Sequence, residues 1–255
     1  MNYIVAAATD IGNTKETNQD CYSVKVFHTP QGKMTFAILC DGMGGLEKGE
    51  LASASLVHAF NKWTEERLPV LSNAPIQDAD IRKDWVDIAT QYNEKIKMYG
   101  KSCAIHLGTT LTAMLLTETR YYIINVGDTR AYEISNHVDV ITSDQTVVAR
   151  EVAMGNLTEE EAKLDPRRSV LLQCVGASDT IYPDMFYGAT KQNAVYMLCS
   201  DGFRHEVTEQ EIYQYLNPGV MTEFDAMQTN MKSLIELNKQ RQETDNITVV
   251  TIRTF

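Results

Sequence analysis

An apolar run that stops at one carboxylate and three glycines constrains the fold of this chain more than any other stretch. Phe36 to Cys40 predicts a buried strand, which runs into Asp41-Gly42-Met43-Gly44-Gly45 before a helical pattern begins. Glycine lets the backbone turn tightly and lets a metal ion or phosphate approach it closely. Asp41 is therefore expected at a strand end, either as a cap in a tight turn or as a ligand.

The same arrangement recurs along the chain. Apolar strand-like runs begin or end near Asp20, Asp128, Asp201 and Asp245, and most of these have a Gly or Asn neighbour. Any one of them could be a solvent-facing turn residue. Together they predict carboxylates that gather at one rim and hold hard cations, because oxygen ligands suit Mg²⁺ and Mn²⁺. Dispersed histidines argue against a zinc site; they are His28, His58, His106, His137 and His205.

Short turns between apolar runs indicate antiparallel sheets, and amphipathic stretches indicate helices packed on them. We expect strands over 3–8, 21–27, 34–40, 111–116, 121–126, 131–134, 138–141, 170–174, 185–187, 194–199 and 247–252. Helical spacing predicts an antiparallel pair around 52–63 and 85–99 joined by a loop at 69–79, a helix starting near Thr208, and another around 224–235. The pattern predicts an α+β fold.

A polar and charged segment, 143–168, interrupts the strand pattern. It is either a surface excursion of no special role or a flap beside the site, because long excursions are often lids or binding loops. We find no internal repeat or clean linker, so we predict one domain over 1–255 with 143–168 inserted as the flap.

Composition limits the partners. A formal net charge of -11 argues against nucleic acid as the main partner, because phosphate backbones select basic surfaces. An anionic substrate would need a local positive centre, which bound divalent cations could supply. The chain shows no signal peptide, no membrane span and no C-x-x-C pair among its five cysteines. We expect a soluble, cytoplasmic protein without a membrane partner.

The motifs occur in an order that resembles the type 2C metal-dependent protein serine/threonine phosphatases, in a compact bacterial form. The matching blocks are Asp10-x-Gly12 with Asn18-Gln19-Asp20, Asp41-Gly42-Met43-Gly44-Gly45, Gly108-Thr109-Thr110, Gly127-Asp128-Thr129-Arg130, Ser200-Asp201-Gly202 and Asp245-Asn246-Ile247-Thr248. Each block is weak alone, whereas the ordered set is specific and spans nearly the whole chain.

The resemblance implies a four-layer α-β-β-α sandwich, in which two antiparallel sheets are flanked by antiparallel helix pairs. It also implies two Mg²⁺ or Mn²⁺ ions at one end of the sandwich. Asp41 would bridge the two ions, the carbonyl of Gly42 would bind the first, and Asp201 and Asp245 would bind the second.

Further positions follow from the same resemblance. Asp20 would hold metal-bound water, and Asp128 with Asp201 would offer a third, weaker metal position. Lys15 stands where many relatives have Arg, so it keeps the charge but not the bidentate fork. It would contact the substrate phosphate, unless it is a solvated loop lysine.

Three departures from the family pattern bear on the chemistry. Gln19 occupies a position that is often Glu, so one charge near the metals is missing. Met43 replaces a histidine that animal relatives use as a proton donor, which leaves the general acid unassigned. His205 stands where some relatives place another acidic ligand of the third metal.

The implied reaction is hydrolysis of phosphoserine and phosphothreonine in proteins by a water that two metals activate. Asp41, Asp201 and Lys15 would be the catalytic residues. The implied partners are phosphorylated proteins made by a serine/threonine kinase, and we expect a monomer. Two alternatives stay open: an inactive relative that binds phosphoproteins or a regulator, and a fold relative that acts on an anti-sigma-factor antagonist. The physiological substrate, the kinase and the choice between Mg²⁺ and Mn²⁺ are not encoded in these motifs.

Overall fold

The structure, a computed structural model, describes residues 1–43 and 48–255, so Gly44 and Gly45 of the first motif lie outside the described residues. The described residues form two five-stranded sheets with only antiparallel neighbours. The first has the order β1 (Tyr3–Asp10), β10 (Ile247–Thr254), β9 (Val195–Cys199), β6 (Arg130–Ile134) and β7 (Val138–Val140). The second has the order β2 (Asp20–Thr29), β3 (Gly32–Asp41), β4 (Leu111–Leu116), β5 (Arg120–Val126) and β8 (Asp184–Ala189).

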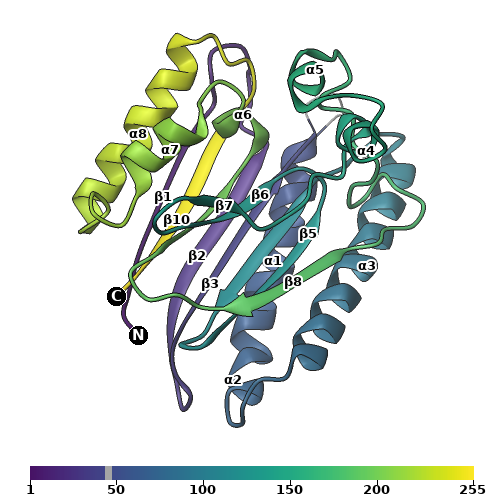
Figure 1. The fold of residues 1–255 in the computed structure, drawn as a ribbon. Helices are drawn as coiled ribbons and strands as arrows, with labels where there is room; N and C mark the ends of the chain where they lie inside the picture. Colours follow the sequence, from purple (N-terminus) through teal and green to yellow (C-terminus); the bar gives the residue numbers. More distant parts are fainter. Residues whose placement is uncertain (44–47) are drawn as a thin grey trace.

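The two sheets pack face to face, and helices cover their outer faces (Figure 1). Leu39 and Met114 of one sheet meet Leu198 and Ile252 of the other in the central hydrophobic cluster. The helices α1 (Gly49–Glu66) and α3 (Asp78–Cys103) cover the second sheet, and α7 (Glu209–Leu216) and α8 (Phe224–Gln240) cover the first. The predicted four-layer α-β-β-α sandwich is confirmed.

Burial on both faces explains why β3 reads as a continuous apolar run rather than an alternating one. Its residues from Met34 to Cys40 are all fully buried, with one face toward the other sheet and one toward α1 and α3. Aromatic rings fill the helix side: Trp63 and Trp85 meet edge to face with centroids 5.5 Å apart, and Phe36 lies 6.1 Å from each of them. Such pairs add to the stabilisation that burial alone gives.

The predicted strand over 170–174 is wrong. This segment makes only isolated bridges, from Leu171 to Thr146 and from Val175 to Thr109. Val170 and Leu172 are 48% and 43% exposed, so their hydrophobicity reflects a surface wall rather than a sheet. The structure also forms short helices that sequence periodicity did not resolve: α2 (Leu68–Leu71), α4 (Val147–Ala153), α5 (Glu159–Leu164) and α6 (Asp201–Arg204).

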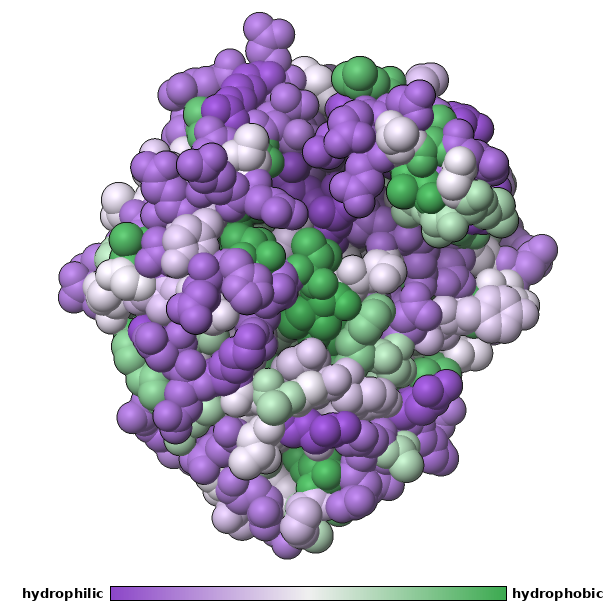
Figure 2. All heavy atoms as spheres, viewed as in Figure 1, coloured by the Kyte–Doolittle hydropathy of each residue, from purple (hydrophilic) through white to green (hydrophobic). Residues whose placement is uncertain are grey.

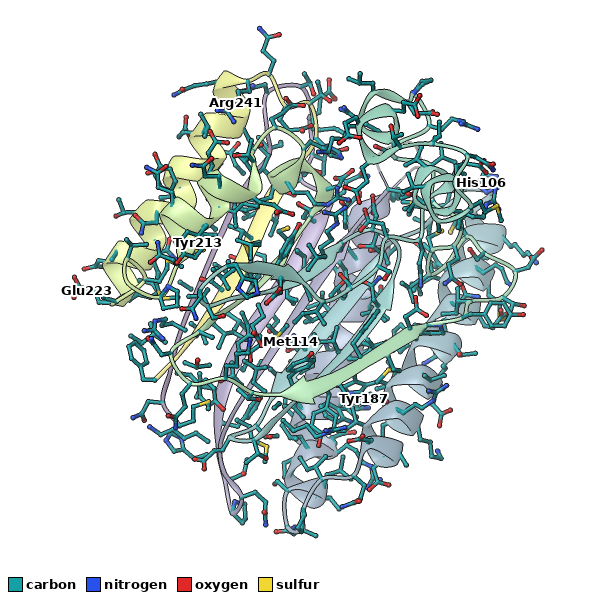
Figure 3. The ribbon with its side chains drawn as sticks, viewed as in Figure 1. His106, Met114, Tyr187, Tyr213, Glu223 and Arg241 are labelled. Carbon is teal, nitrogen blue, oxygen red and sulfur yellow. The ribbon has the colours of Figure 1, made fainter. Side chains whose placement is uncertain are left out.

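An ion pair at the end of α8 connects it to α7, the other helix on the first sheet. Arg241, labelled in Figure 3, donates hydrogen bonds to both carboxylate oxygens of Glu211 in α7, at 2.9 and 2.6 Å. Thr208 and Glu211 form a capping box at the start of α7, where the sequence predicts a helix to begin. No helix of the described residues is both long and apolar enough to cross a lipid bilayer.

Candidate active site

The first two carboxylates of the predicted site lie opposite each other at the ends of paired strands. Asp20 opens β2 and Asp41 closes β3, and the strand register pairs them directly. Thr110 fixes the backbone of Asp41: its N–H donates to the Asp41 carbonyl at 2.8 Å, and its Oγ1 accepts from the Asp41 N–H at 2.9 Å. The Thr109 hydroxyl donates to the same carbonyl at 3.0 Å. Asp41 is therefore held at a defined place.

Gly42 continues this turn where no side chain fits. Its N–H donates to the Gln19 carbonyl at 3.1 Å. A Cβ on Gly42 would lie 2.6 Å from the Gly49 backbone and 2.7 Å from the Gln19 carbonyl oxygen. The glycine thus lets the start of α1, the loop before β2 and the end of β3 meet at one point.

Asp201 and Asp245 lie on two turns that touch. A Cβ on Gly202 would lie 2.3 Å from the Asn246 carbonyl oxygen, so only glycine allows this approach. The Asn246 side chain, 2% exposed, donates to the carbonyls of Ile11 and Thr17 and accepts from the Gln19 N–H. Asn246 therefore holds the loop before β2 against the turn that carries Asp245.

These turns border one pocket of about 560 Å³. Five of the predicted site residues line it: Lys15, Asp41, Asp128, Asp201 and Asp245. Figure 2 shows a hydrophilic hollow between the side of the molecule that carries α8 and the side that carries α4 and α5. Gly42 and Asp20 are not among the lining residues. Gly42 adjoins Asp41 in the chain, and Asp20 lies behind Asp41 on the neighbouring strand.

Burial raises the pKa of three of these carboxyl groups. The pKa of Asp20 rises to about 7, to which the carboxylates of Asp201 and Asp245 contribute. The pKa of Asp128 also rises to about 7, with Asp201 adding to the rise and Arg204 opposing it. The pKa of Asp41 rises well above its ordinary value, through burial first and Asp20 next. The groups are close enough to oppose one another's ionisation.

Several of the carboxylate oxygens have no hydrogen-bond partner. Both oxygens of Asp20 and Oδ1 of Asp201 are buried and unpaired. A buried carboxylate is costly unless a hydrogen bond or a cation compensates it. This set of oxygens is the chemistry that Mg²⁺ or Mn²⁺ would satisfy, so the residues present fit a divalent cation.

Lys15 lies between the pocket and Asp245. Its Nζ is 2.9 Å from Oδ1 of Asp245, and the two side chains are 28% and 35% exposed. Burial lowers the pKa of Lys15, but the carboxylates of Asp245, Asp41 and Asp201 raise it more, so the ammonium stays charged. Across residues 1–43 and 48–255, no three acidic, imidazole or thiol groups form a ready cation cage. Water would therefore have to complete the coordination of an ion, and displacement of Lys15 would free Oδ1 of Asp245 to bind it.

Sequence reasoning missed four residues and one segment of this site. Arg204 and Asp144 lie beside Asp128, and Glu243 lies beside His205. Thr110 belongs to a motif that was noted without a role. The segment 169–178 lines the pocket wall directly after the expected flap. No sequence pattern singles out Arg204 or Glu243 as part of the site. The apolar run at 170–174 marks the pocket wall, although its hydrophobicity predicted a strand.

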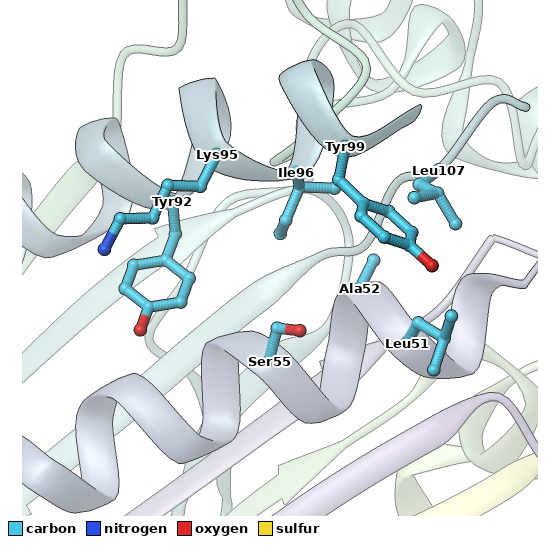
Figure 4. Close-up of a pocket in the computed structure, with 8 residues that line it drawn as sticks. All are labelled: Leu51, Ala52, Ser55, Tyr92, Lys95, Ile96, Tyr99 and Leu107. Atoms are coloured by element: carbon cyan, nitrogen blue, oxygen red, sulfur yellow. The ribbon is translucent and has the colours of Figure 1, made fainter. Parts of the chain in front are cut away.

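A second concavity lies away from these residues. It is a groove of about 360 Å³ between α1 and α3, where Leu51 and Ala52 near the start of α1 face Ile96 and Tyr99 near the end of α3 (Figure 4). This contact shows that α1 and α3 run antiparallel. None of the described residues that line the groove carries a carboxylate, and none of them lines the acidic pocket.

Comparison with known proteins gives a consistent result. The family described as Protein phosphatase 2C matches residues 12–238. The serine/threonine phosphatase stp of Listeria monocytogenes is 30% identical over 212 residues, which is 82% of this chain and 81% of that protein. The serine/threonine phosphatase Stp1 of Staphylococcus aureus has a crystal structure with a TM-score of 0.85 at 25% identity, covering 100% of this chain and 96% of that chain.

A further solved structure shares the fold. The catalytic domain of the serine/threonine protein phosphatase PstP, in complex with two manganese ions, has a TM-score of 0.76 at 24% identity. The similarity covers 98% of this chain and 97% of that chain. The family match, the relatives of similar length and the shared sandwich agree with the order of the acidic motifs. This chain belongs to the protein phosphatase 2C family and is a protein serine/threonine phosphatase.

Proposed function

We propose that this phosphatase hydrolyses phosphoserine and phosphothreonine in proteins with the help of two divalent cations, Mg²⁺ or Mn²⁺. Asp41 and the carbonyl of Gly42 would hold one ion, and Asp41, Asp201 and Asp245 the other. Asp20 would hold water molecules that are bound to the ions. The observation that carries the proposal is the set of buried, unpaired oxygens of Asp20 and Asp201 beside a pocket lined by Asp41.

The ions would supply positive charge for the phosphoryl oxygens and a water made acidic enough to attack phosphorus near neutral pH. The protein supplies position. Thr110 fixes the backbone of Asp41, and Asn246 fixes the turn of Asp245. These contacts would fix where a bound phosphate lies relative to the carboxylates. A chain with a net charge of -11 needs the local positive charge of the ions to bind phosphate.

Lys15 would bind the substrate phosphate. It is charged, lies in the pocket wall and reaches Asp245 from the loop before β2. Leu171 and Leu172 line the same pocket and would offer an apolar surface to the part of the substrate that surrounds the phosphorylated side chain. The water oxygen would form a bond to phosphorus and lose a proton while the bond between phosphorus and the serine or threonine oxygen breaks. The departing serine or threonine oxygen would take up a proton.

We further propose that 1–255 works as one domain and that 143–168, which carries α4 and α5, acts as a flap. The segment lies beside the pocket because its continuation, 169–178, forms a wall of it. Proteins phosphorylated by a serine/threonine kinase would be the substrates, and the enzyme would act as a monomer. Light scattering at the enzyme concentration used in the activity assay tests the monomer. A dimer at that concentration would contradict this part of the proposal.

The direct test is phosphate release from a phosphothreonine peptide with Mn²⁺, with Mg²⁺ and with EDTA. We expect activity with either ion and none with EDTA. Asp41→Asn and Asp201→Asn should each lower kcat/KM by about a hundredfold or more, the scale of losing a group that stabilises transition-state charge. Asp139→Asn is the matched control, because this carboxylate on β7 is 45% exposed and lies 2.9 Å from Nε2 of His137, outside the residues that line the acidic pocket. Full activity in EDTA, or in both site variants, would sink the proposal.

A further inference from the structure

A buried arginine lies at the carboxylate that would carry a third metal ion. Arg204 ends α6, the helical turn that begins at Asp201, and its side chain is 12% exposed. Its Nη2 lies 3.6 Å from Oδ2 of Asp128 and donates to the Asp128 carbonyl at 3.1 Å. Asp128 is 4% exposed, so the guanidinium reaches its carboxylate from inside the protein.

A second ion pair fixes this arginine in place. Nη2 of Arg204 also donates to Oδ2 of Asp144 at 3.2 Å. Arg130 binds both oxygens of Asp144 through Nε and Nη2, at 2.7 and 2.8 Å. Two arginines and two aspartates thus form a partly buried network whose formal charges cancel. Nη2 of Arg204 contacts both aspartates, and the bidentate fork of Arg130 fixes Asp144.

A histidine lies at Asp201, the second carboxylate of the expected third metal site. His205 lies with Nε2 3.5 Å from Oδ2 of Asp201 and Nδ1 3.2 Å from Oε2 of Glu243. Glu243 in turn accepts the backbone N–H groups of Thr244 and Asp245 through Oε1. An imidazole therefore stands beside Asp201, on the helical turn that also carries the guanidinium beside Asp128.

We propose that Arg204 takes the place of a third cation at Asp128, so that this enzyme binds two divalent ions and not three. The inference rests on the proposed two-ion function. A third ion would have to sit next to a fixed guanidinium, and like charges at such a distance inside a protein repel strongly. The residues at Asp128 do not fit a cation, although those at Asp41, Asp201 and Asp245 do.

The proposal predicts a gain of binding, which loss of structure cannot imitate. Removing the guanidinium leaves Asp128 buried without its partner and free to attract an ion. Arg204→Gln should therefore bind one more Mn²⁺ than the wild type, in the millimolar range. Arg204→Lys keeps a positive charge at the site and should bind the same number as the wild type. The double variant Arg204→Gln with Asp128→Asn should lose the added ion again.

The experiment is a count of bound Mn²⁺ on the full chain, by calorimetry and by electron paramagnetic resonance of the free ion, up to millimolar Mn²⁺. Circular dichroism and thermal melting of each variant accompany the count. We expect two ions on the wild type and three on Arg204→Gln. Three ions on the wild type, or two on a folded Arg204→Gln, would overturn the inference and leave the two-ion proposal standing. No bound ion on the wild type would overturn both.

If Arg204→Gln does not fold, the wild-type count still decides the matter, because two and three ions give different stoichiometries. Asp128→Asn in the wild-type background is the second variant for that case. It should leave the count at two if Arg204 already satisfies Asp128. A count that falls from three to two in this variant would show that an ion had been bound there.

Discussion

Nζ of Lys15 lies 2.9 Å from Oδ1 of Asp245, so the cation proposed to bind phosphate is joined to a carboxylate proposed to bind metal. The Asp245 carboxylate cannot bind a metal ion and keep its full interaction with Lys15 at the same time. When an ion reaches Asp245, Lys15 loses part of its attraction to that carboxylate and becomes available to the phosphate. The arrangement would link the proposed metal binding to the proposed substrate binding through a single side chain.

Removing Lys15 should separate these two effects. In Lys15→Ala we expect Mn²⁺ to bind about twofold to fivefold more tightly, because a partly exposed ion pair is worth about 1 kcal/mol or less. The KM for a phosphopeptide should rise about tenfold, since a charge-assisted contact to phosphate is lost. Calorimetry gives the first value and steady-state kinetics the second.

Lys15→Arg is the matched control for that pair of measurements. It keeps the charge and adds a bidentate fork, so its KM should stay near or below the wild-type value. A weaker Mn²⁺ affinity in Lys15→Ala would contradict the competition between the lysine and the ion. An unchanged KM would remove Lys15 from substrate binding.

The raised pKa values predict how stability depends on pH in the absence of metal. In the folded protein the pKa of Asp20 and that of Asp128 are each about 7, above the value of about 4 for an unfolded aspartate. Between these values the folded state binds more protons than the unfolded state, so stability falls as pH rises through the window. With EDTA, Tm should drop on the order of 5 °C between about pH 5 and about pH 8.

Two comparisons check that pH effect. Saturating Mn²⁺ should reduce the drop, because the ion binds the ionised carboxylates of the folded state. Asp128→Asn should flatten the metal-free profile, because one of the titrating groups is gone. A metal-free Tm that rises steadily across the same window would show that these groups do not govern it.

Gly202 should tolerate no side chain. In Gly202→Ala the new Cβ would meet the Asn246 carbonyl oxygen at 2.3 Å, so the two turns that carry Asp201 and Asp245 would have to separate. We expect a loss of about 2–4 kcal/mol in the free energy of unfolding, together with weaker Mn²⁺ binding. Gly219→Ala is the control, because its nearest neighbour is the Asn217 side chain at 3.1 Å, which can move. Equal stability of the two variants in urea would contradict the close packing.

Asn246 should matter for loop placement rather than for chemistry. Asn246→Ala removes side-chain hydrogen bonds to the backbone of Ile11, Thr17 and Gln19 and leaves these partly buried groups without that partner. We expect a loss of about 1–3 kcal/mol in stability and faster amide hydrogen exchange confined to 11–19. Asn217→Ala, on an exposed turn, serves as the comparison. Exchange that speeds up evenly over the whole chain would point to general destabilisation instead.

The buried strands and the buried helix faces could be predicted from the residues because burial leaves a direct record in the sequence, whereas the four-layer arrangement was implied by the family resemblance. Phe36 to Cys40 is apolar without interruption because β3 is buried on both faces, and Ala52, Phe60 and Trp63 recur at helical spacing because α1 buries one face. The run at 170–174 misled because a hydrophobic pocket wall and a strand look alike over five residues. The length and composition of such a run do not distinguish a pocket wall from a strand.

The placement of the carboxylates at strand ends could also be foreseen, since Asp20 and Asp41 close a hairpin that the sequence marks clearly. Their proposed roles as ligands stay predictions. The partners of the third position could not be foreseen. Arg204 and His205 are consecutive, yet one reaches Asp128 and the other reaches Glu243, across 76 and 38 positions of the chain. Only the folded backbone sets which way such side chains point.

The pairing of β1 with β10 has a practical consequence. The register joins Tyr3 to Thr254 at one end and Asp10 to Ile247 at the other, and Asn2 and Phe255 exchange backbone hydrogen bonds at the first end. Each strand has eight residues, so about 26 Å separates the termini, side by side in Figure 1, from the end that bears Asp245. A fluorescent tag, a surface anchor or a short linker that closes the chain into a circle could be attached there without obstructing access for a phosphorylated partner.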